Sequence, residues 1–149
     1  MNPMQNMKIN GINEVLLEEY PGYVFWKDPE STYLGCNRNF AAISGLNCPA
    51  EIIGKSDKDL PWLSTEMKQY IKNDQQVMKS ADPLINIVER QTDSQKNRRI
   101  CIISKYPIFK ENLDVAGIIG LYRFSNEALN LGQHLLSFSH DAISDSEKI

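Results

Sequence analysis

Apolar and polar residues alternate along three segments in the second half of the chain, residues 84–92, 99–109 and 115–124. Such alternation is typical of strands that bury one face. A polar stretch, residues 93–98, separates the first two segments and predicts a hairpin loop. Residues 23–36 contain two shorter runs, rich in aromatic and β-branched side chains and joined by a turn. We therefore expect five strands.

Helical spacing of apolar residues predicts the elements around these strands. Residues 12–19 carry apolar side chains at i, i+3 and i+4 and predict a short helix. Residues 64–80 predict one long helix, whose apolar stripe is interrupted by Asp74. Short helical turns are expected over residues 37–63, and a helical pattern resumes over residues 127–140. Helices packed on one face of a five-stranded antiparallel sheet make an α+β fold.

Length and charge limit the classes of partner. The chain has 149 residues, of which 42% are hydrophobic and 23% charged, as expected for one folded domain. The net charge is -3 and the basic residues are scattered, which argues against nucleic-acid binding because phosphates need a concentrated basic face. The sequence has no apolar run long enough to cross a bilayer, and its first ten residues lack the apolar core of a signal peptide. We expect a cytoplasmic chain without membrane contact.

Cysteine and histidine positions predict neither a disulfide framework nor a metal site. The three cysteines, Cys36, Cys48 and Cys101, contain no C-x-x-C pair. His134 and His140 are six residues apart and would lie on different sides of a helix. No serine, cysteine or threonine can be paired with a histidine base from the sequence. We therefore expect no catalytic residue and no enzyme activity from this chain alone.

The order of several short motifs resembles that of bacterial PAS sensory domains, as found in sensor histidine kinases. The motifs include Phe25-Trp26-Lys27-Asp28, Tyr33-Leu34-Gly35-Cys36-Asn37, Asp59-Leu60-Pro61-Trp62, Ser104-Lys105-Tyr106-Pro107 and Gly117-Ile118-Ile119-Gly120. The resemblance covers residues 23–124, with residues 1–22 as an N-terminal flanking helix and residues 125–149 as a C-terminal signalling helix and tail. It implies a cupped sheet whose helices close a small cavity, used for sensing, dimerisation or signal relay.

Five matching positions have physical roles independent of the resemblance. Asn37 is expected to cap the helix that follows it, and Asp57 to cap the next irregular turn. Gly117 and Gly120 would let a helix or a ligand approach the sheet closely. A buried carboxylate at Asp74 must be hydrogen-bonded, and a neighbouring loop backbone or an indole is the favoured partner over a ligand.

The cavity that the resemblance implies is expected to bind a small apolar ligand with a polar end. The candidate ligand-binding residues are Phe25, Phe40, Ile43, Leu60, Trp62, Tyr70, Ile103 and Ile119. The alternative, that these side chains fill a closed core, is equally compatible with the sequence.

The usual PAS cofactors are disfavoured. Covalent flavin sensing needs a reactive cysteine within an Asn-Cys-Arg-Phe type motif, and here Cys36 precedes Asn37 at the end of a predicted strand. Haem sensing generally needs an axial histidine, and no histidine occurs before residue 134. We therefore predict no cofactor.

Two hypotheses for function follow. In the first, the chain is a sensory module that forms a homodimer through its flanking helices and signals to an output domain or a partner kinase. In the alternative, it is the sensor fragment of a histidine kinase. Ser139-His140-Asp141 resembles the start of a phosphoacceptor box, which makes His140 a candidate phosphorylation site, although residues 142–144 depart from that pattern. Phe124-Ser125-Asn126 also departs from the Asp-Ile-Thr step that couples PAS domains to their output.

Overall fold

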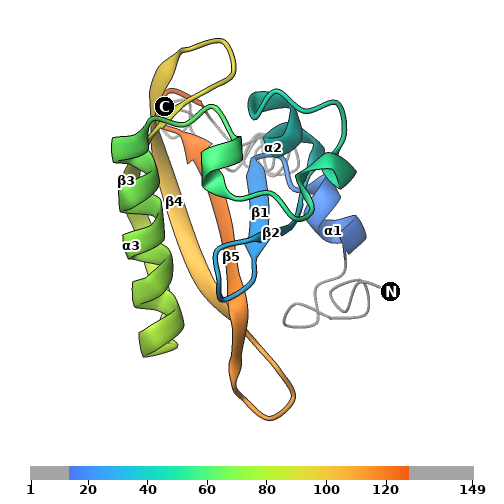
Figure 1. Ribbon diagram of the computed structural model, residues 1–149, viewed down its shortest axis with the longest axis vertical. Helices are drawn as coiled ribbons and strands as arrows, with labels where there is room; N and C mark the ends of the chain where they lie inside the picture. The colour runs from blue at the N-terminus through green and yellow to red at the C-terminus, as the bar shows by residue number, and fades with distance from the viewer. Residues whose placement is uncertain (1–13, 128–149) are drawn as a thin grey trace, which may run out of the picture.

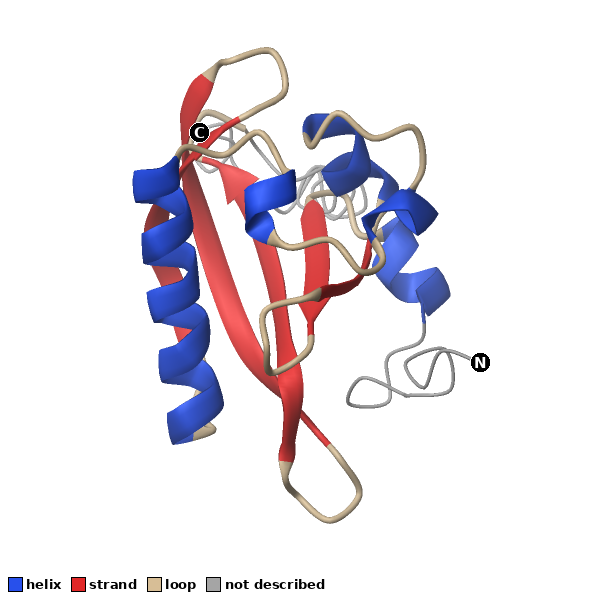
Figure 2. Cartoon of the chain, in the orientation of Figure 1, coloured by secondary structure: helices blue, strands red, loops and turns tan. Residues whose placement is uncertain are grey.

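The computed structural model describes residues 14–127, which form a five-stranded antiparallel sheet with helices packed against it (Figures 1 and 2). The strand order is β2-β1-β5-β4-β3. The first and last strands are therefore neighbours at the centre of the sheet, where Phe25 pairs with Gly120. The strands are β1 (Tyr23–Lys27), β2 (Tyr33–Cys36), β3 (Leu84–Thr92), β4 (Arg98–Phe109) and β5 (Val115–Phe124).

The helices divide between the two halves of the sheet. The long helix α3 (Ser64–Ser80) packs against β3, β4 and β5, whereas α2 (Arg38–Ile43) packs against β1. Two 3-10 turns connect α2 to α3: η2 (Pro49–Ile52) packs against α2 and β2, and η3 (Asp57–Asp59) packs against α3. The described part of the chain opens with α1 (Glu14–Glu19).

The predicted α+β fold and the five strands are confirmed, because long periodic segments carry a clear pattern. The long helix occupies the predicted residues 64–80, and Asn37 caps α2 by accepting a hydrogen bond from the Phe40 N–H at 3.0 Å. One boundary was misplaced: Arg98, assigned to the hairpin loop, is the first residue of β4 and pairs with Thr92. The predicted helix over residues 127–140 lies outside the described residues.

Two hydrophobic clusters cover the two faces of the sheet. Side chains alternate between the faces along each strand, so Phe25 joins the cluster under α2 and α3, while Trp26 joins the other. In that second cluster, Leu17 of α1 packs with Trp26 and Ile119. The larger cluster, between the sheet and the two helices, holds the cavity described below.

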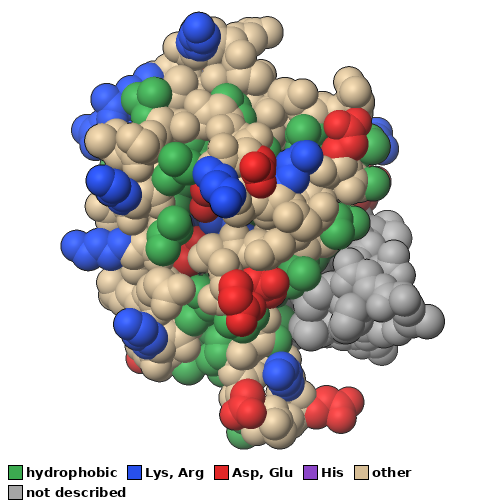
Figure 3. All heavy atoms as spheres, viewed as in Figure 1, with side chains coloured by type: hydrophobic (Ala, Val, Ile, Leu, Met, Phe, Trp, Pro, Cys, Tyr) green, Lys and Arg blue, Asp and Glu red, His purple; other side chains and the backbone are tan. Residues whose placement is uncertain are grey.

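Charged side chains are dispersed over the face seen in Figure 3. Several basic side chains line the side on which α3 lies, and others lie beside acidic ones near the centre and at the lower end of this view, so neither sign makes one continuous patch on this face. Within residues 14–127, no helix is both long enough and apolar enough to span a bilayer.

Candidate functional site

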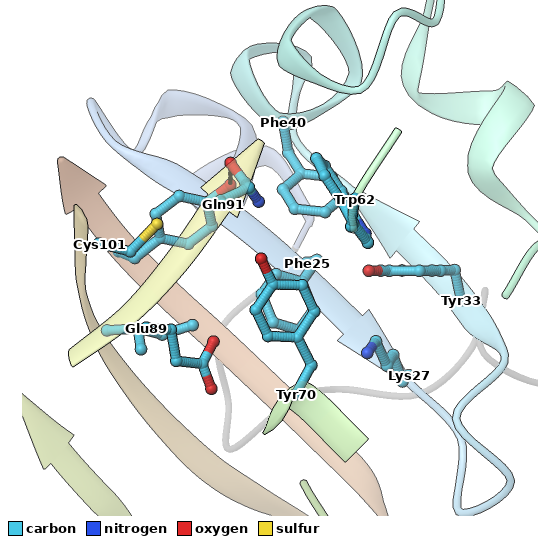
Figure 4. Close-up of a pocket in the computed structure, with 11 residues that line it drawn as sticks. Phe25, Lys27, Tyr33, Phe40, Trp62, Tyr70, Glu89, Gln91 and Cys101 are labelled. Atoms are coloured by element: carbon cyan, nitrogen blue, oxygen red, sulfur yellow. Dashed lines mark hydrogen bonds between the residues drawn. The ribbon is translucent and has the colours of Figure 1, made fainter. Parts of the chain in front are cut away.

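A small internal cavity lies between the sheet and the helices that cover it (Figure 4). Its volume is about 20 Å³, enough for roughly one water molecule. All five strands and both α2 and α3 contribute to its wall. The lining residues are Phe25, Lys27, Tyr33, Phe40, Trp62, Tyr70, Glu89, Gln91, Cys101, Ile103 and Tyr122.

Aromatic rings form much of this wall, with Phe40 of α2 among them. The Phe40 ring centroid lies 5.1 Å from that of Phe25, 5.9 Å from that of Trp62 and 6.2 Å from that of Tyr122. These separations are typical of favourable aromatic pairs. The wall is therefore held by mutual ring contacts as well as by burial.

Gly120 makes room for one of these rings. A Cβ atom at position 120 would lie 2.3 Å from the Phe25 ring, so any larger residue would displace it. At Gly117, where φ is +150°, a Cβ would lie 2.0 Å from the carbonyl oxygen of Lys27. The close approach expected at both glycines is thus made by β1, the neighbouring strand, and not by a helix.

Five charged residues form a continuous chain of contacts through the core, which we call the buried ion network. Lys27 Nζ lies 2.7 Å from the Asp57 carboxylate and 2.9 Å from that of Asp74. Lys105 Nζ lies 2.6 Å from the other Asp74 oxygen and 2.7 Å from Glu89. Each of the five side chains is at most 5% exposed. The network joins β1, η3, α3, β4 and β3.

Further hydrogen bonds hold the two ends of the network. Asp57 Oδ1 accepts hydrogen bonds from the Tyr33 hydroxyl at 2.5 Å and from the Trp62 indole at 3.0 Å. At the other end, the side-chain amide of Asn73 donates to Glu89 at 2.9 Å. Buried charges need such partners, because an isolated ion in the core is strongly disfavoured.

Two sequence-based expectations about these carboxylates were wrong. Asp57 was expected to cap a turn. Instead, the Asp59 carboxylate accepts the hydrogen bond from the Ser56 backbone N–H, and the Asp57 side chain points into the core. Asp74 was expected to bond a loop backbone or the Trp62 indole. It bonds two lysines instead, because alternation along β1 and β4 turns Lys27 and Lys105 inward.

The network changes the proton affinities of its members. Burial alone would lower the pKa of Lys27, but the carboxylates of Asp74 and Asp57 outweigh it and raise that pKa. Burial alone would raise the pKa of Asp74, whereas Lys27 and Lys105 hold that pKa below its usual value. Burial and the adjacent Asp57 raise the pKa of Tyr33 well above its usual value. Lys27 and Asp74 are thus held in their charged forms and Tyr33 in its neutral form.

The structure brings together five of the eight predicted ligand-binding residues. Phe25, Phe40, Trp62, Tyr70 and Ile103 line the cavity, and their role in binding stays a prediction.

The other three do not line the cavity. Leu60 and Ile43 belong to the same core without reaching the cavity, and Ile119 lies on the opposite face of the sheet. His140 is outside the described residues, so the kinase alternative is untested.

The sequence-based list omitted the polar lining residues. Lys27, Glu89 and Gln91 all line the cavity. A parity argument would have found Lys27, because it is two residues after Phe25 and therefore shares its face. Glu89 and Gln91 share a face with each other, but the list held only apolar and aromatic side chains and named neither.

Comparisons with known proteins agree on the fold. A family model described as PAS fold matches residues 17–124. No curated protein matches the chain.

Among solved structures, VqmA bound to DPO superposes with a TM-score of 0.69 at 18% identity, over 80% of this chain and 59% of that chain. A Vibrio cholerae VqmA dimer, described as a LuxR-type receptor in the absence of target DNA, gives 0.67 at 18% identity, over 80% of this chain and 52% of that one. This chain therefore spans between about half and three fifths of the VqmA chains.

A third structure is the PAS domain, in complex with ethanol, of a LuxR-family transcriptional regulator from Burkholderia thailandensis. It superposes with a TM-score of 0.59 at 15% identity, over 76% of this chain and 97% of that chain. At identities this low the likeness to these structures shows the fold alone.

Proposed function

Because the chain belongs to the PAS-fold family, we propose that it is a non-catalytic sensory module that binds a small molecule in the cavity between α3 and the sheet. Occupancy of the cavity is then passed to an output domain or a partner protein. The observation that carries this proposal is the cavity itself, because its wall combines aromatic rings with two buried charged side chains, Lys27 of β1 and Glu89 of β3. Small-molecule sites in proteins typically combine an apolar wall with a few placed polar groups.

The same wall offers a way to transmit occupancy. The cavity holds about one water molecule, so a ring-sized ligand has to displace lining side chains. Tyr70 lies on α3, where its hydroxyl donates to the Arg90 carbonyl of β3. Asp74, one turn further along α3, ties the helix to β1 and β4 through its two lysines. A ligand that moves α3 therefore acts on three strands at once.

The structural neighbours support small ligands and assembly as parts of this proposal. VqmA is described as bound to DPO and as a dimer, and the Burkholderia thailandensis domain is in complex with ethanol. We propose by analogy that this chain works as a cytoplasmic homodimer. Target DNA is named for VqmA, whose chain is longer than this one, and we assign no nucleic acid to residues 14–127.

We also propose that the module works without haem or covalent flavin. Cys36 and Cys101 are buried, and burial, followed by the charge of Glu18, raises the pKa of the Cys36 thiol to about 12. Such a thiol is a poor nucleophile toward a flavin. Freshly purified protein should therefore show no visible absorption band, and a stoichiometric band lost on denaturation would contradict this.

The proposal can be tested by titrating the full chain, labelled with ¹⁵N, with one-ring compounds and recording amide chemical shifts. Saturable shifts should be confined to residues around the cavity. In Cys101→Leu, the larger side chain occupies the cavity and the shifts should disappear. Cys48→Leu is the matched control, because Cys48 is exposed. Shifts that do not saturate, or that survive unchanged in Cys101→Leu, would exclude the cavity as a binding site.

A further inference from the structure

Two polar atoms on the cavity wall have no hydrogen-bond partner within residues 14–127. Glu89 uses Oε2 for both Lys105 and Asn73, which leaves Oε1 unpaired among the described residues. Gln91 uses Oε1 to accept from the Tyr122 hydroxyl at 3.0 Å, which leaves its Nε2 amide without an acceptor in the same part of the chain. Both side chains are 5% exposed and both line the cavity.

The two side chains are neighbours on one wall. They are two residues apart on β3, so both point to the same face and their backbone positions lie about 7 Å apart. Figure 4 shows them on the β3 side of the cavity, opposite Lys27 and with Tyr70 between. One wall therefore offers a hydrogen-bond acceptor beside a hydrogen-bond donor.

The charge of the buried ion network defines the ligand further. With all its members ionised, three carboxylates face two ammonium groups, so the network carries one excess negative charge. Both lysines already contact two carboxylates each. An anionic ligand would add to the excess and would find both lysines occupied. A ligand that donates a hydrogen bond to Glu89 would instead stabilise the excess charge.

From these observations we propose that the ligand is a small planar nitrogen heterocycle that donates an N–H to Glu89 and accepts a hydrogen bond from Gln91. The ring of the ligand lies among the aromatic side chains of Phe25, Phe40 and Tyr70. Its two faces contact these side chains, which in the unliganded protein pack in one hydrophobic cluster. This assignment rests on the proposed function, since it names the ligand class of the same cavity.

Four probes of nearly equal size test it on the unmodified full chain. Toluene offers neither group, aniline only a donor, 2-methylpyridine only an acceptor, and 2-aminopyridine, at a pH that keeps its ring nitrogen unprotonated, both on one edge. We expect 2-aminopyridine to bind at least tenfold more tightly than toluene, with aniline between, because a hydrogen bond to a charged group contributes enough for such a factor. Benzoate, the anionic probe, should not bind.

The outcomes separate this inference from the proposed function. If toluene binds the cavity as tightly as 2-aminopyridine, the cavity is a ligand site but the heterocycle assignment is overturned. Preferred binding of benzoate overturns it as well. If no probe gives saturable shifts, both the assignment and the proposed cavity function fall.

A variant pair assigns the preference to Glu89. Glu89→Gln keeps the size of the side chain but removes the carboxylate, and should lower the affinity for 2-aminopyridine about tenfold while leaving that for toluene unchanged. Glu30→Gln, at an exposed turn position, is the control and should change neither. Equal losses of affinity for 2-aminopyridine and toluene in Glu89→Gln would indicate a structural effect and overturn the role of Glu89. If the variant does not fold, the probe series on the unmodified chain still decides the ligand class.

Discussion

Lys27 and Lys105 keep their ammonium groups in the core, each 1% exposed, by sharing the carboxylate of Asp74. Lys27 and Lys105 each contact two carboxylates, whereas Asp57 and Glu89 each contact a single lysine, so removal of either lysine leaves a carboxylate uncompensated. A buried pair contributes little compared with an apolar pair of the same shape, but breaking it is strongly destabilising. We therefore expect the network to add more to the specificity of the fold than to its stability.

Replacing Lys27 by methionine tests this asymmetry. Lys27→Met leaves Asp57 and Asp74 close together without their shared cation, so we expect a loss of about 3–5 kcal/mol in the free energy of unfolding. Arg38→Met is the control, because its 3.6 Å ion pair with Glu18 is exposed and should contribute less than about 1 kcal/mol. The measurement is urea unfolding followed by circular dichroism. Equal effects of the two substitutions would show that the ammonium of Lys27 has no special role.

The pH dependence follows from the same contacts. The two lysines lower the pKa of Asp74 in the folded state below its ordinary value of 3.8, so its contribution to stability is present above that pH and is lost as the pH falls through the folded pKa. The pKa of Lys27 is raised above 10.5, so its contribution is present below that pH and is lost as the pH rises through the folded pKa. We expect a plateau in stability between about pH 5 and pH 9.

A direct measurement is available for Asp74. The ¹³C shift of its carboxyl group, followed through an acid titration of the folded chain, should have its midpoint below 3.8. A midpoint above that value would mean that burial outweighs the two lysines.

At the scale of elements, Asn37 connects three segments of the chain. Its Oδ1 accepts from the N–H groups of Val24 in β1 and Phe40 in α2, and its amide donates to the Gly22 carbonyl at 2.9 Å. The side chain is 1% exposed. It therefore acts as a helix cap and as a link between α2 and the first strand.

Substitution of this cap should cost more than substitution of an ordinary one. Asn37→Ala removes an N-cap and leaves buried backbone groups unpaired, so we expect a loss of about 2–4 kcal/mol. Ser56→Ala, at the half-buried N-cap of η3, should cost no more than about 1 kcal/mol, because the Ser56 N–H keeps its bond to Asp59. Thermal or urea unfolding of both variants measures the difference, and similar losses would contradict the linking role.

Most elements could be predicted from the sequence, and most of the polar contacts between them could not. The apolar run within residues 115–124 identifies β5, a central strand buried on both faces: Ile118 lies in one hydrophobic cluster and Ile119 in the other. The same pattern does not reveal that β5 lies beside β1, since pairing of distant strands depends on the whole packing arrangement. The partners of Lys105 come from α3 and β3, so its burial becomes evident only once these elements are placed.

At the scale of the whole molecule, the outer face of the sheet is covered unevenly. Residues 17–20 cover part of it through contacts of Leu17 and Tyr20. Beyond them, β3 and β4 expose apolar side chains on the described surface, including Val88 at 54% and Ile100 at 40%. Exposed apolar surface of this kind is typical of interfaces between proteins.

We predict that the full chain is a homodimer at tens of micromolar and that removal of residues 1–22 weakens it. The physical reasons are the apolar surface of the outer face, which association would remove from water, and the apolar positions that the sequence predicts on helices over residues 12–19 and 127–140. Analytical ultracentrifugation of the two chains, with circular dichroism to verify that the shorter one folds, provides the test. A monomeric full chain would refute the prediction.

The buried ion network also bears on how sequences of this kind diverge. Neither lysine can lose its charge alone without leaving Asp57 or Glu89 without its only cation, and Asp74 is shared by both lysines. Tolerated changes are therefore expected in groups, for example an apolar residue at position 27 together with one at position 57. Among relatives, positions 27, 57, 74, 89 and 105 should covary, and an alignment in which they vary independently would show that this arrangement is not inherited as a unit.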